Sequence, residues 1–357
     1  MNMRRLLKLM VEKEASDIFL SINSKPRARI LGTVQEFDDA VIDARGMGLI
    51  ADYLLGDGYR KVKFEEDKAV DFIYVEPDVG RFRVNMFIQR GTPALVARHV
   101  KWEIPGFSEL HLPEQLLQKL CNEANGMVLL CGPAGSGKST TIAAMLENIN
   151  EHQNKHIVTI EDPIEYLFHH KQSMINQREI GVDVLAYPDA LKHVTQQSPD
   201  IIYIGNIRDL ETMKAAITAT ELGTFVVSTF HTINAVQTIT RIVNFFPPYL
   251  HEEVLMQLSV ILKAVISLRL LPRKDGSGRI PAYETMVVTP AIAKMIREGK
   301  INEIQRFIDE GDLFGMQSFR KSLVSLVKKD LVSEEDARYR ADSRDEFDME
   351  MRGIQQI

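Results

Sequence analysis

A short run of glycines beside a lysine and a serine is the part of this sequence best suited to chemistry. Residues 132–139 read GPAGSGKS, which matches the pattern G-x-x-x-x-G-K-[ST]. Glycines let the backbone curl so that several N–H groups face an anion, and the start of a following helix favours that anion. Lys138 can reach the terminal phosphates, and Ser139 can ligate magnesium. The pattern therefore predicts a binding loop for ATP and Mg²⁺.

The predicted nucleotide contacts cover this loop and one residue beyond it. They are Gly132, Pro133, Ala134, Gly135, Ser136, Gly137, Lys138, Ser139 and Thr140. A strand-like run, MVLLC, precedes the loop, and KSTTIAAMLENIN can continue from it as a helix. An ordinary glycine turn is the competing interpretation, and the strand–loop–helix context disfavours it.

Further buried strands are predicted on the carboxyl side of the loop. HIVTI at 156–160, DIIYIG at 200–205 and TFVVSTF at 224–230 are short apolar runs, each followed by a loop and a helix-compatible stretch. This alternation is typical of a parallel α/β sheet with right-handed crossovers. We assign residues 113–357 to this domain, with a mostly helical C-terminal extension after Pro272 that includes a helix start at Ser333.

Residues 1–98 form a separate, smaller α+β domain in our interpretation. It begins with an amphipathic helix, and its strand-like runs lie at 27–32, 69–75 and 81–89. The run at 81–89 alternates apolar and polar residues, which is typical of a strand with one buried face. Residues 99–112 are predicted as a linker, because Pro105 and Gly106 interrupt any regular pattern and Pro113 follows.

Composition excludes several classes of protein. The 357 residues carry a net charge of −6, so the chain lacks the basic excess of a nucleic-acid binder. Two cysteines, Cys121 and Cys131, are too few for a disulfide framework or a four-cysteine zinc site, and they favour the cytoplasm. The apolar run from 254 to 271 is interrupted by polar residues, so we expect membrane contact to be peripheral or through a partner.

Carboxylates follow one of the predicted strands. The stretch TIEDPIEYLFHH at 159–170 places Glu161, Asp162 and Glu165 at the edge of the sheet where ligands bind. A carboxylate there can orient a water molecule or accept its proton. Taken alone, these acids would be interpreted as surface residues of a proline turn.

Three more motifs accompany them, and together they resemble a known superfamily. NQREIGVD lies at 176–183, PDIIYIGNIRDLET at 199–212 and STFHTINA at 228–235. The set resembles the secretion ATPases that drive type II secretion and type IV pili. EDPIE corresponds to their aspartate box, DIIYIGN to the Walker B strand and TFHT to the histidine box.

Within that superfamily the chain is similar to the retraction branch, the PilT/PilU family. PAIAKMIREGK at 290–300 is similar to the AIRNLIRE element of that branch. LLKLMVEKEASDIF near the start, RIVNFFP at 241–247 and the tail GMQSF…SEEDARYRADS are closer to PilU. The resemblance implies a PAS-like N-terminal domain and a RecA-like ATPase domain.

The resemblance also implies roles for individual residues and an assembly. Glu165 would be the catalytic glutamate, and His231 would sense the nucleotide state. Arg83 and Arg98 would reach from the N-terminal domain to the nucleotide, since guanidinium groups suit phosphates. The family assembles as homohexamers that act on an inner-membrane platform protein, so we expect a cytoplasmic protein that is peripheral at that membrane.

The sequence departs from the family pattern at two places. Asn206 occupies the Walker B position where a metal-serving glutamate is expected, and its amide is neutral. Asp200 cannot replace it, because six strand residues separate the two by roughly 20 Å. Asp209, in the following loop, stays open as a substitute. Lys192 and Gln196 stand where the family has two arginines.

These observations favour a hexameric ATPase that retracts type IV pili and so supports twitching motility. Because the Walker B acid is missing, a nucleotide-binding, weakly active accessory subunit that supports a paralogous retraction ATPase is the alternative. A secretion or pilus-extension ATPase is disfavoured by the short N-terminal region and the absence of four zinc cysteines. A nucleic-acid motor is disfavoured by the acidic net charge, so we expect no nucleic-acid partner.

Overall fold

The computed structural model describes residues 2–56, 58–100 and 104–353. The chain divides into two compact units. The first is Met1–Glu103 together with Glu165–Leu167, and the second is Ile104–Ile164 together with Phe168–Ile357.

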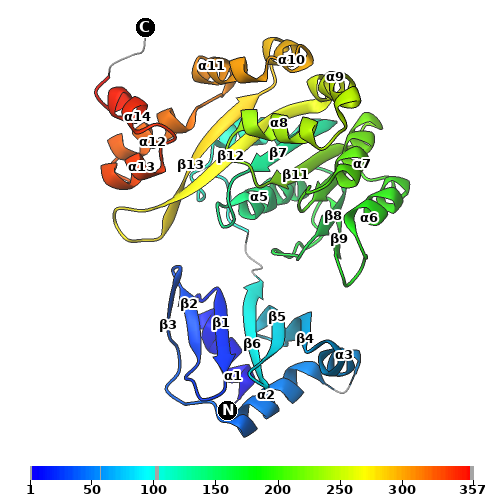
Figure 1. Cartoon of the computed structure of the whole chain (residues 1–357), viewed down its shortest axis with the longest axis vertical. Coiled ribbons are helices and arrows are strands. Elements are labelled where there is room, and N and C mark those ends of the chain that lie inside the picture. The colour runs from blue at the N-terminus through cyan, green and yellow to red at the C-terminus, as the bar shows by residue number, and fades with distance from the viewer. Residues whose placement is uncertain (1, 57, 101–103, 354–357) are drawn as a thin grey trace. The chain divides into compact units, whose positions relative to one another are not determined.

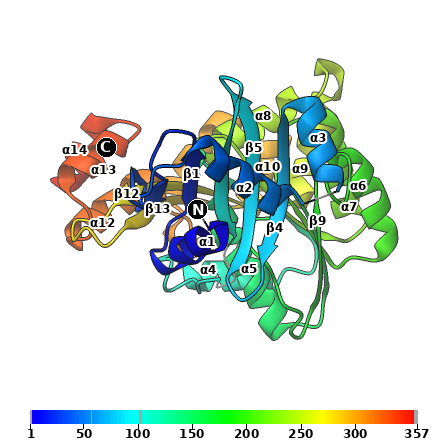
Figure 2. The same cartoon turned by 90° about the horizontal axis from the view of Figure 1, so that it is seen from below.

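The first unit is built on a six-stranded antiparallel sheet, with the strand order β3-β2-β1-β6-β5-β4 (Figure 1). The strands are β1 (Asp17–Ser21), β2 (Arg27–Ile30), β3 (Thr33–Glu36), β4 (Ala69–Glu76), β5 (Gly80–Gln89) and β6 (Thr92–Val100). The helices are α1 (Met3–Glu12), α2 (Ala44–Leu55) and α3 (Tyr59–Asp67), which cover one face of the sheet (Figure 2). The predicted α+β class is confirmed.

Period-two alternation determines which face of this sheet is covered. Phe82, Val84 and Met86 of β5 are fully buried against the helices. The residues between them lie on the opposite face, as expected for a strand with one buried side. The predicted amphipathic first helix is also present, and Asn2 caps it by accepting a hydrogen bond from the Arg5 amide at 3.3 Å.

The predicted linker divides into three parts. Residues 99 and 100 complete β6, and residues 101–103 lie outside the described residues. Phe107 and Leu112 are buried in the core of the second unit, beside helix α4 (Glu114–Cys121). Apolar side chains at these two positions therefore tie this part of the predicted linker to the second unit.

A seven-stranded sheet forms the centre of the second unit, with the order β13-β12-β7-β11-β10-β8-β9. The strands are β7 (Gly126–Cys131), β8 (His156–Glu161), β9 (Met174–Glu179), β10 (Ile201–Ile204), β11 (Phe225–Phe230), β12 (Leu262–Pro272) and β13 (Arg279–Val287). Strand β13 is antiparallel to β12, and the other neighbours are parallel. Every residue of β7 and β11 is buried, which is typical of a parallel sheet covered on both faces.

Helices cover both faces of this sheet (Figure 1). One face packs against α4 and α5 (Lys138–His152). The other packs against α6 (Tyr187–Val194), α7 (Leu210–Glu221), α8 (Ala235–Asn244), α9 (His251–Ile261), α10 (Pro290–Arg297) and α11 (Ile304–Asp309). Short 3₁₀ turns lie at Thr195–Gln197, Pro248–Leu250, Ile301–Glu303 and Asp312–Phe314.

The C-terminal extension is helical, as predicted. It comprises α12 (Phe319–Lys328), α13 (Glu334–Arg340) and α14 (Arg344–Met351), which pack on the ends of β12 and β13. The predicted helix start at Ser333 is confirmed, since its hydroxyl oxygen accepts a hydrogen bond from the Asp336 amide at 3.1 Å.

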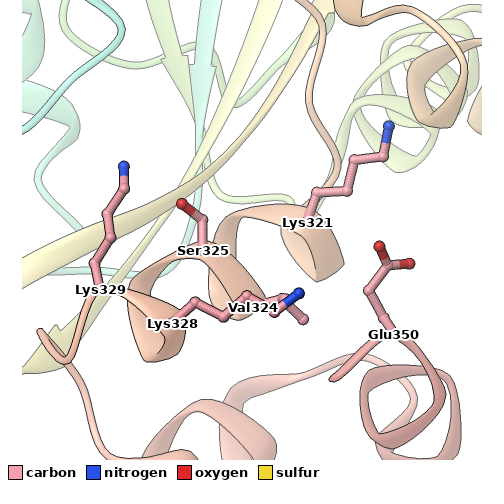
Figure 3. Close-up of a pocket in the computed structure, with 6 residues that line it drawn as sticks. All are labelled: Lys321, Val324, Ser325, Lys328, Lys329 and Glu350. Carbon is pink, nitrogen blue, oxygen red and sulfur yellow. The ribbon is translucent and has the colours of Figure 1, made fainter. Parts of the chain in front are cut away.

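Helices α12 and α14 border a shallow pocket of about 320 Å³. Its lining residues are Lys321, Val324, Ser325, Lys328, Lys329 and Glu350. The three ammonium groups lie apart from one another (Figure 3), and that of Lys321 is held by Asp312 at 2.8 Å. The pocket therefore does not gather its positive charge around one point.

Two sequence expectations concern thiols and membranes. Cys121 and Cys131 are buried free thiols, and burial raises their pKa values to about 12 and about 11. Within the described ranges, no helix combines the length and the apolar character that crossing a membrane requires.

Glu284 of β13 is a carboxyl group in the core of the second unit. Its exposed fraction is 2%, and burial, the largest cause, raises its pKa to about 7. The nearby charge of Asp342 also raises the pKa, whereas hydrogen bonds from the Ala235 amide and Gln305 and the charge of Arg269 lower it. Burial disfavours the charged form because the protein interior solvates it less well than water does.

The titration of Glu284 predicts how stability depends on pH. Its folded pKa lies above the ordinary value of 4.5, so the folded state holds this proton more tightly than the unfolded state does. The contribution to stability is therefore fully present below about pH 4.5 and is lost as pH rises to about 7. In Glu284→Gln this loss is absent.

As pH rises from 5 to 8, we expect the unfolding free energy of Glu284→Gln to increase relative to that of the parent by up to about 3 kcal/mol. Thermal or denaturant unfolding of both proteins at each pH measures the gain. A difference that stays constant over this range would contradict the raised pKa.

Candidate active site

The predicted phosphate loop joins the end of β7 to the start of α5. Gly137 precedes the helix with φ 98°, in the left-handed region that favours glycine. Gly132 has φ 143°, and a Cβ at this position would lie 2.4 Å from the Leu268 carbonyl oxygen and 2.6 Å from the Ser136 hydroxyl. Close packing of the loop against β12 therefore requires glycine at position 132.

Lys138 lies inside this loop. Its side chain is buried, and its Nζ donates hydrogen bonds of 2.9 Å to the carbonyl oxygens of Gly132 and Pro133. The buried hydroxyl of Ser136 has no hydrogen-bond partner among the described residues. A polar atom left unpaired in this way is costly without a ligand, and a phosphate oxygen is a suitable partner.

Strand register brings three motifs to the same edge of the sheet. Cys131 pairs with Phe230 across β7 and β11, and Ile204 of β10 pairs with Ser228 of β11 and with Ile160 of β8. The residues that follow these strands therefore emerge side by side, with about 4.8 Å between neighbouring strands. Gly132 and His231 directly follow β7 and β11, Asn206 is the second residue after β10, and Glu161 is the last residue of β8.

His231 directly follows β11, the strand next to β7. Its pKa is lowered, first by burial and then by the positive charges of Lys138, Arg208 and Arg241. A lowered pKa keeps the imidazole neutral at pH 7, so one ring nitrogen donates and the other accepts. A neutral His231 can therefore hydrogen-bond to a phosphate near Lys138 without adding a positive charge of its own.

Asn206 is buried just beyond β10, and its Oδ1 has no hydrogen-bond partner within the described part of the chain. The preceding Gly205 is tightly enclosed, since a Cβ there would lie 2.9 Å from the Tyr187 hydroxyl and 3.2 Å from the Glu161 Cα. The Tyr187 hydroxyl is also buried without a partner in the described ranges, and burial raises its pKa. Sequence reasoning missed Tyr187, because only the fold brings it to this strand end.

The two aspartates near Asn206 serve other purposes. Asp209 caps α7, where its oxygens accept hydrogen bonds from the Thr212 amide and hydroxyl, both at 2.8 Å. Asp200 lies before β10 and accepts a hydrogen bond from the His156 amide at 2.8 Å. Both carboxylates are thus committed to local structure, and Asp209 is not poised to replace the missing Walker B acid.

The carboxylates of the EDPIE motif differ in their surroundings. Glu161 is buried, and its Oε1 accepts hydrogen bonds from the Thr159 hydroxyl at 2.7 Å and from Gln177 at 3.1 Å. Glu165 is exposed in the irregular segment that follows. Glu179 fixes the backbone of that segment by accepting a hydrogen bond from the Ile164 amide at 3.1 Å.

The two residues that stand where the family pattern has arginines lie in α6 and in the turn after it. Lys192 is in the last turn of α6, and Gln196 is in the 3₁₀ turn at Thr195–Gln197. Both side chains are exposed.

Arg83 and Arg98 lie next to each other on the face of the first unit's sheet that the helices leave uncovered, since the strand register pairs them directly. Arg83 Nε is 3.0 Å from both oxygens of Asp71, and Arg98 Nε is 2.8 Å from Asp17 Oδ1. Arg29, from the next strand, contacts the other oxygen of Asp17 at 3.4 Å. The result is a row of charged side chains in which each arginine contacts an aspartate, and we call it the arginine–aspartate row.

Comparison of the sequence and the structure with known proteins identifies the family of this chain. A sequence profile described as "Type II/IV secretion system protein" matches residues 94–336. The chain belongs to this family. It is 39% identical over 347 residues to the type IV pilus retraction ATPase PilT of Pseudomonas aeruginosa, covering 97% of this chain and 100% of that protein. It is 36% identical over 347 residues to the type IV pilus ATPase PilU of the same species, covering 97% and 90%.

Two further comparisons agree with this membership. The chain is 41% identical over 316 residues to a twitching motility protein of Neisseria gonorrhoeae, covering 88% of this chain and 84% of that protein. The crystal structure of the pilus retraction motor PilT with bound ADP superimposes with a TM-score of 0.89 at 41% identity, covering 97% and 98%. The chain is therefore a retraction-type ATPase with the predicted two-part, RecA-like architecture.

The candidate metal ligands of this retraction-type ATPase suit magnesium in their atom type but not in their charge. Ser139 and Asn206 both offer neutral oxygen atoms, and oxygen is the ligand that magnesium prefers. The unpaired, buried Oδ1 of Asn206 suits a polar ligand or its water shell. Neither residue brings a negative charge of its own to the metal.

Gly132→Ala tests the phosphate loop. The new methyl group would meet the Leu268 carbonyl, which is backbone and cannot rotate away, so the loop must shift. We expect the affinity for ADP to fall at least tenfold, as judged by titration with a fluorescent ADP analogue. Ala134→Ser, at an exposed position of the same loop, keeps the backbone amide through which this residue would contact phosphate, so it should bind like the parent. Equal affinities of Gly132→Ala and the parent would contradict the predicted role of the loop.

Proposed function

We propose that this chain is the motor subunit of a homohexamer that retracts type IV pili by hydrolysing ATP. In this proposal the hexamer is cytoplasmic and acts on an inner-membrane platform protein of the pilus machinery. One observation carries the assignment of the nucleotide site. A buried lysine lies inside a glycine loop at the sheet edge that His231 and the Walker B strand share.

The residues of the second unit support nucleotide binding in distinct ways. Loop amides and the start of α5 attract the phosphates, and Lys138 adds a positive charge. Lys138 exchanges its carbonyl partners, Gly132 and Pro133, for phosphate oxygens when nucleotide binds. His231, whose pKa is lowered first by burial and then by neighbouring positive charges, would detect whether the terminal phosphate is present.

Magnesium, when bound with ATP, neutralises phosphate charge and orients the reacting groups. Ser139 and Asn206 would hold it or its water shell. Glu165 would orient the attacking water, and this role rests on the family resemblance.

Arg83 and Arg98 would add positive charge to the nucleotide from the first unit. Their position on an uncovered sheet face supports this role, because a guanidinium group there can exchange one anion for another. Since Asp71 and Asp17 hold them in the structure, phosphate would have to compete with these carboxylates.

Steady-state ATP hydrolysis by the purified chain with magnesium tests the proposal. We expect slow turnover in the parent, because the neutral Asn206 replaces a carboxylate. Asn206→Glu should accelerate it at least tenfold, since loss of one charged group at such sites costs orders of magnitude in rate. Lys138→Ala should abolish both hydrolysis and ADP binding.

Asn206→Asp is the matched variant, because it changes only the charge at this position. A rate that stays the same in both acidic variants would show that position 206 does not limit turnover. Absence of magnesium-dependent nucleotide binding by the parent would overturn the assignment of the site.

A weakly active accessory subunit is the second candidate function. The cap formed by Asp209 favours it, because that carboxylate is already occupied and leaves position 206 without a substitute acid. In this case, mixing the chain with an active paralogous retraction ATPase should raise hydrolysis or pilus retraction above the sum of the two proteins alone. Brisk turnover of the pure chain would contradict it.

A further inference from the structure

A chain of buried polar groups connects the strand before the phosphate loop to the helix after His231. The Cys131 Sγ and the Ser267 Oγ are 3.2 Å apart. The Ser267 hydroxyl donates to Glu284 Oε1 at 3.5 Å, and the same oxygen accepts a hydrogen bond from the Ala235 amide at 3.0 Å. All four residues are buried. Buried polar groups need such partners, so each link constrains the next.

The link to Ala235 fixes the start of α8. Ala235 is the first residue of that helix, and the first amides of a helix have no partner within it. Asn234 accepts the Gln237 amide at 2.8 Å, and Glu284 accepts that of Ala235. The segment that begins at His231 is therefore anchored from the helix itself and, independently, from β13.

Two further contacts extend this anchor. The hydroxyl groups of Thr232 and Thr238 are 2.6 Å apart, which ties the residue after His231 to the first turns of α8. Gln305 of α11 donates to Glu284 Oε2 at 3.4 Å. Glu284 thus connects the strand of the phosphate loop, the segment after His231 and the helices that cover this face of the sheet.

We propose that Glu284 is a positioning residue for nucleotide turnover, which holds the segment from His231 to Ala235 in register with the phosphate loop. The inference rests on the proposed function of His231. All contacts of Glu284 named above are with protein groups, so it acts through His231 and the loop. The competing interpretation is a carboxyl group that only fills the core.

Three variants of the full-length chain separate these interpretations. Glu284→Met keeps the length of the side chain and removes the acceptor, whereas Glu284→Gln keeps an oxygen that can accept the Ala235 amide. Both remove the buried charge, which is often tolerated. Thr285→Val is the matched control, because Thr285 is buried on the same strand but bonds the Gly315 carbonyl instead of α8.

Amide hydrogen exchange, read by mass spectrometry with and without ADP, is the deciding measurement. In Glu284→Met we expect exchange over residues 231–237 to accelerate about tenfold, because a buried amide loses its partner. Glu284→Gln should stay within threefold of the parent. Thr285→Val should change exchange near residue 315 and leave 231–237 as in the parent.

Turnover and binding give the functional readout. Glu284→Met should lower the rate at saturating ATP at least tenfold and leave ADP affinity within threefold, and Glu284→Gln should restore the rate. Exchange in Glu284→Met that is unchanged over 231–237, or raised equally throughout the chain, would overturn the inference. Failure of the parent to bind ADP would refute the proposed function instead, and the exchange comparison would still decide the role of Glu284.

Discussion

Hydrogen-bonded register between parallel strands is the constraint on which the nucleotide site depends. The loop at 132–137, His231 and Asn206 are far apart in sequence, and each simply follows a strand. They meet because β7 and β11 end level with one another and β10, which pairs with β11, ends only two residues earlier. A slip of one residue would turn every buried side chain of a strand toward the opposite face, so packing on both faces fixes this level. Stability and chemistry therefore rest on the same backbone pairing.

Sequence patterns predicted the features that local chemistry determines. The phosphate loop, the strand at 81–89 and the cap at Ser333 each depend on neighbouring residues, and the structure has all three elements. Strand β12 was missed because α9 ends at Ile261 and the strand begins at Leu262, with no glycine or proline between them. The contact of Tyr187 with Gly205 escaped prediction for a different reason, since only tertiary packing brings the two together.

In the proposed function, the neutral Asn206 affects catalysis more than binding. The loop and Lys138 are intact, so attraction of phosphate does not depend on position 206. Acidic neighbours offer no replacement, because Asp209 is used as a helix cap and Asp200 lies before the strand. In that proposal the parts that recognise a nucleotide are present, and the residue that would serve the metal is neutral. In the proposed hexamer, such a subunit would bind nucleotide even where it hydrolysed little.

The arginine–aspartate row has a consequence for the energetics of the uncovered sheet face. Arg83 and Arg98 already have counter-ions, so an arriving anion exchanges one ion pair for another instead of creating a new one. The Arg83–Asp71 pair is partly exposed and is worth at most about 1 kcal/mol, so exchange there is inexpensive in either direction, whereas the Asp17 carboxylate of the other pair is buried. Asp71 would then be left to water or to a cation, whereas the buried Asp17 would keep its contact with Arg29. The fraction of these arginines that pair with an arriving anion would therefore depend on the salt concentration as well as on the ligand.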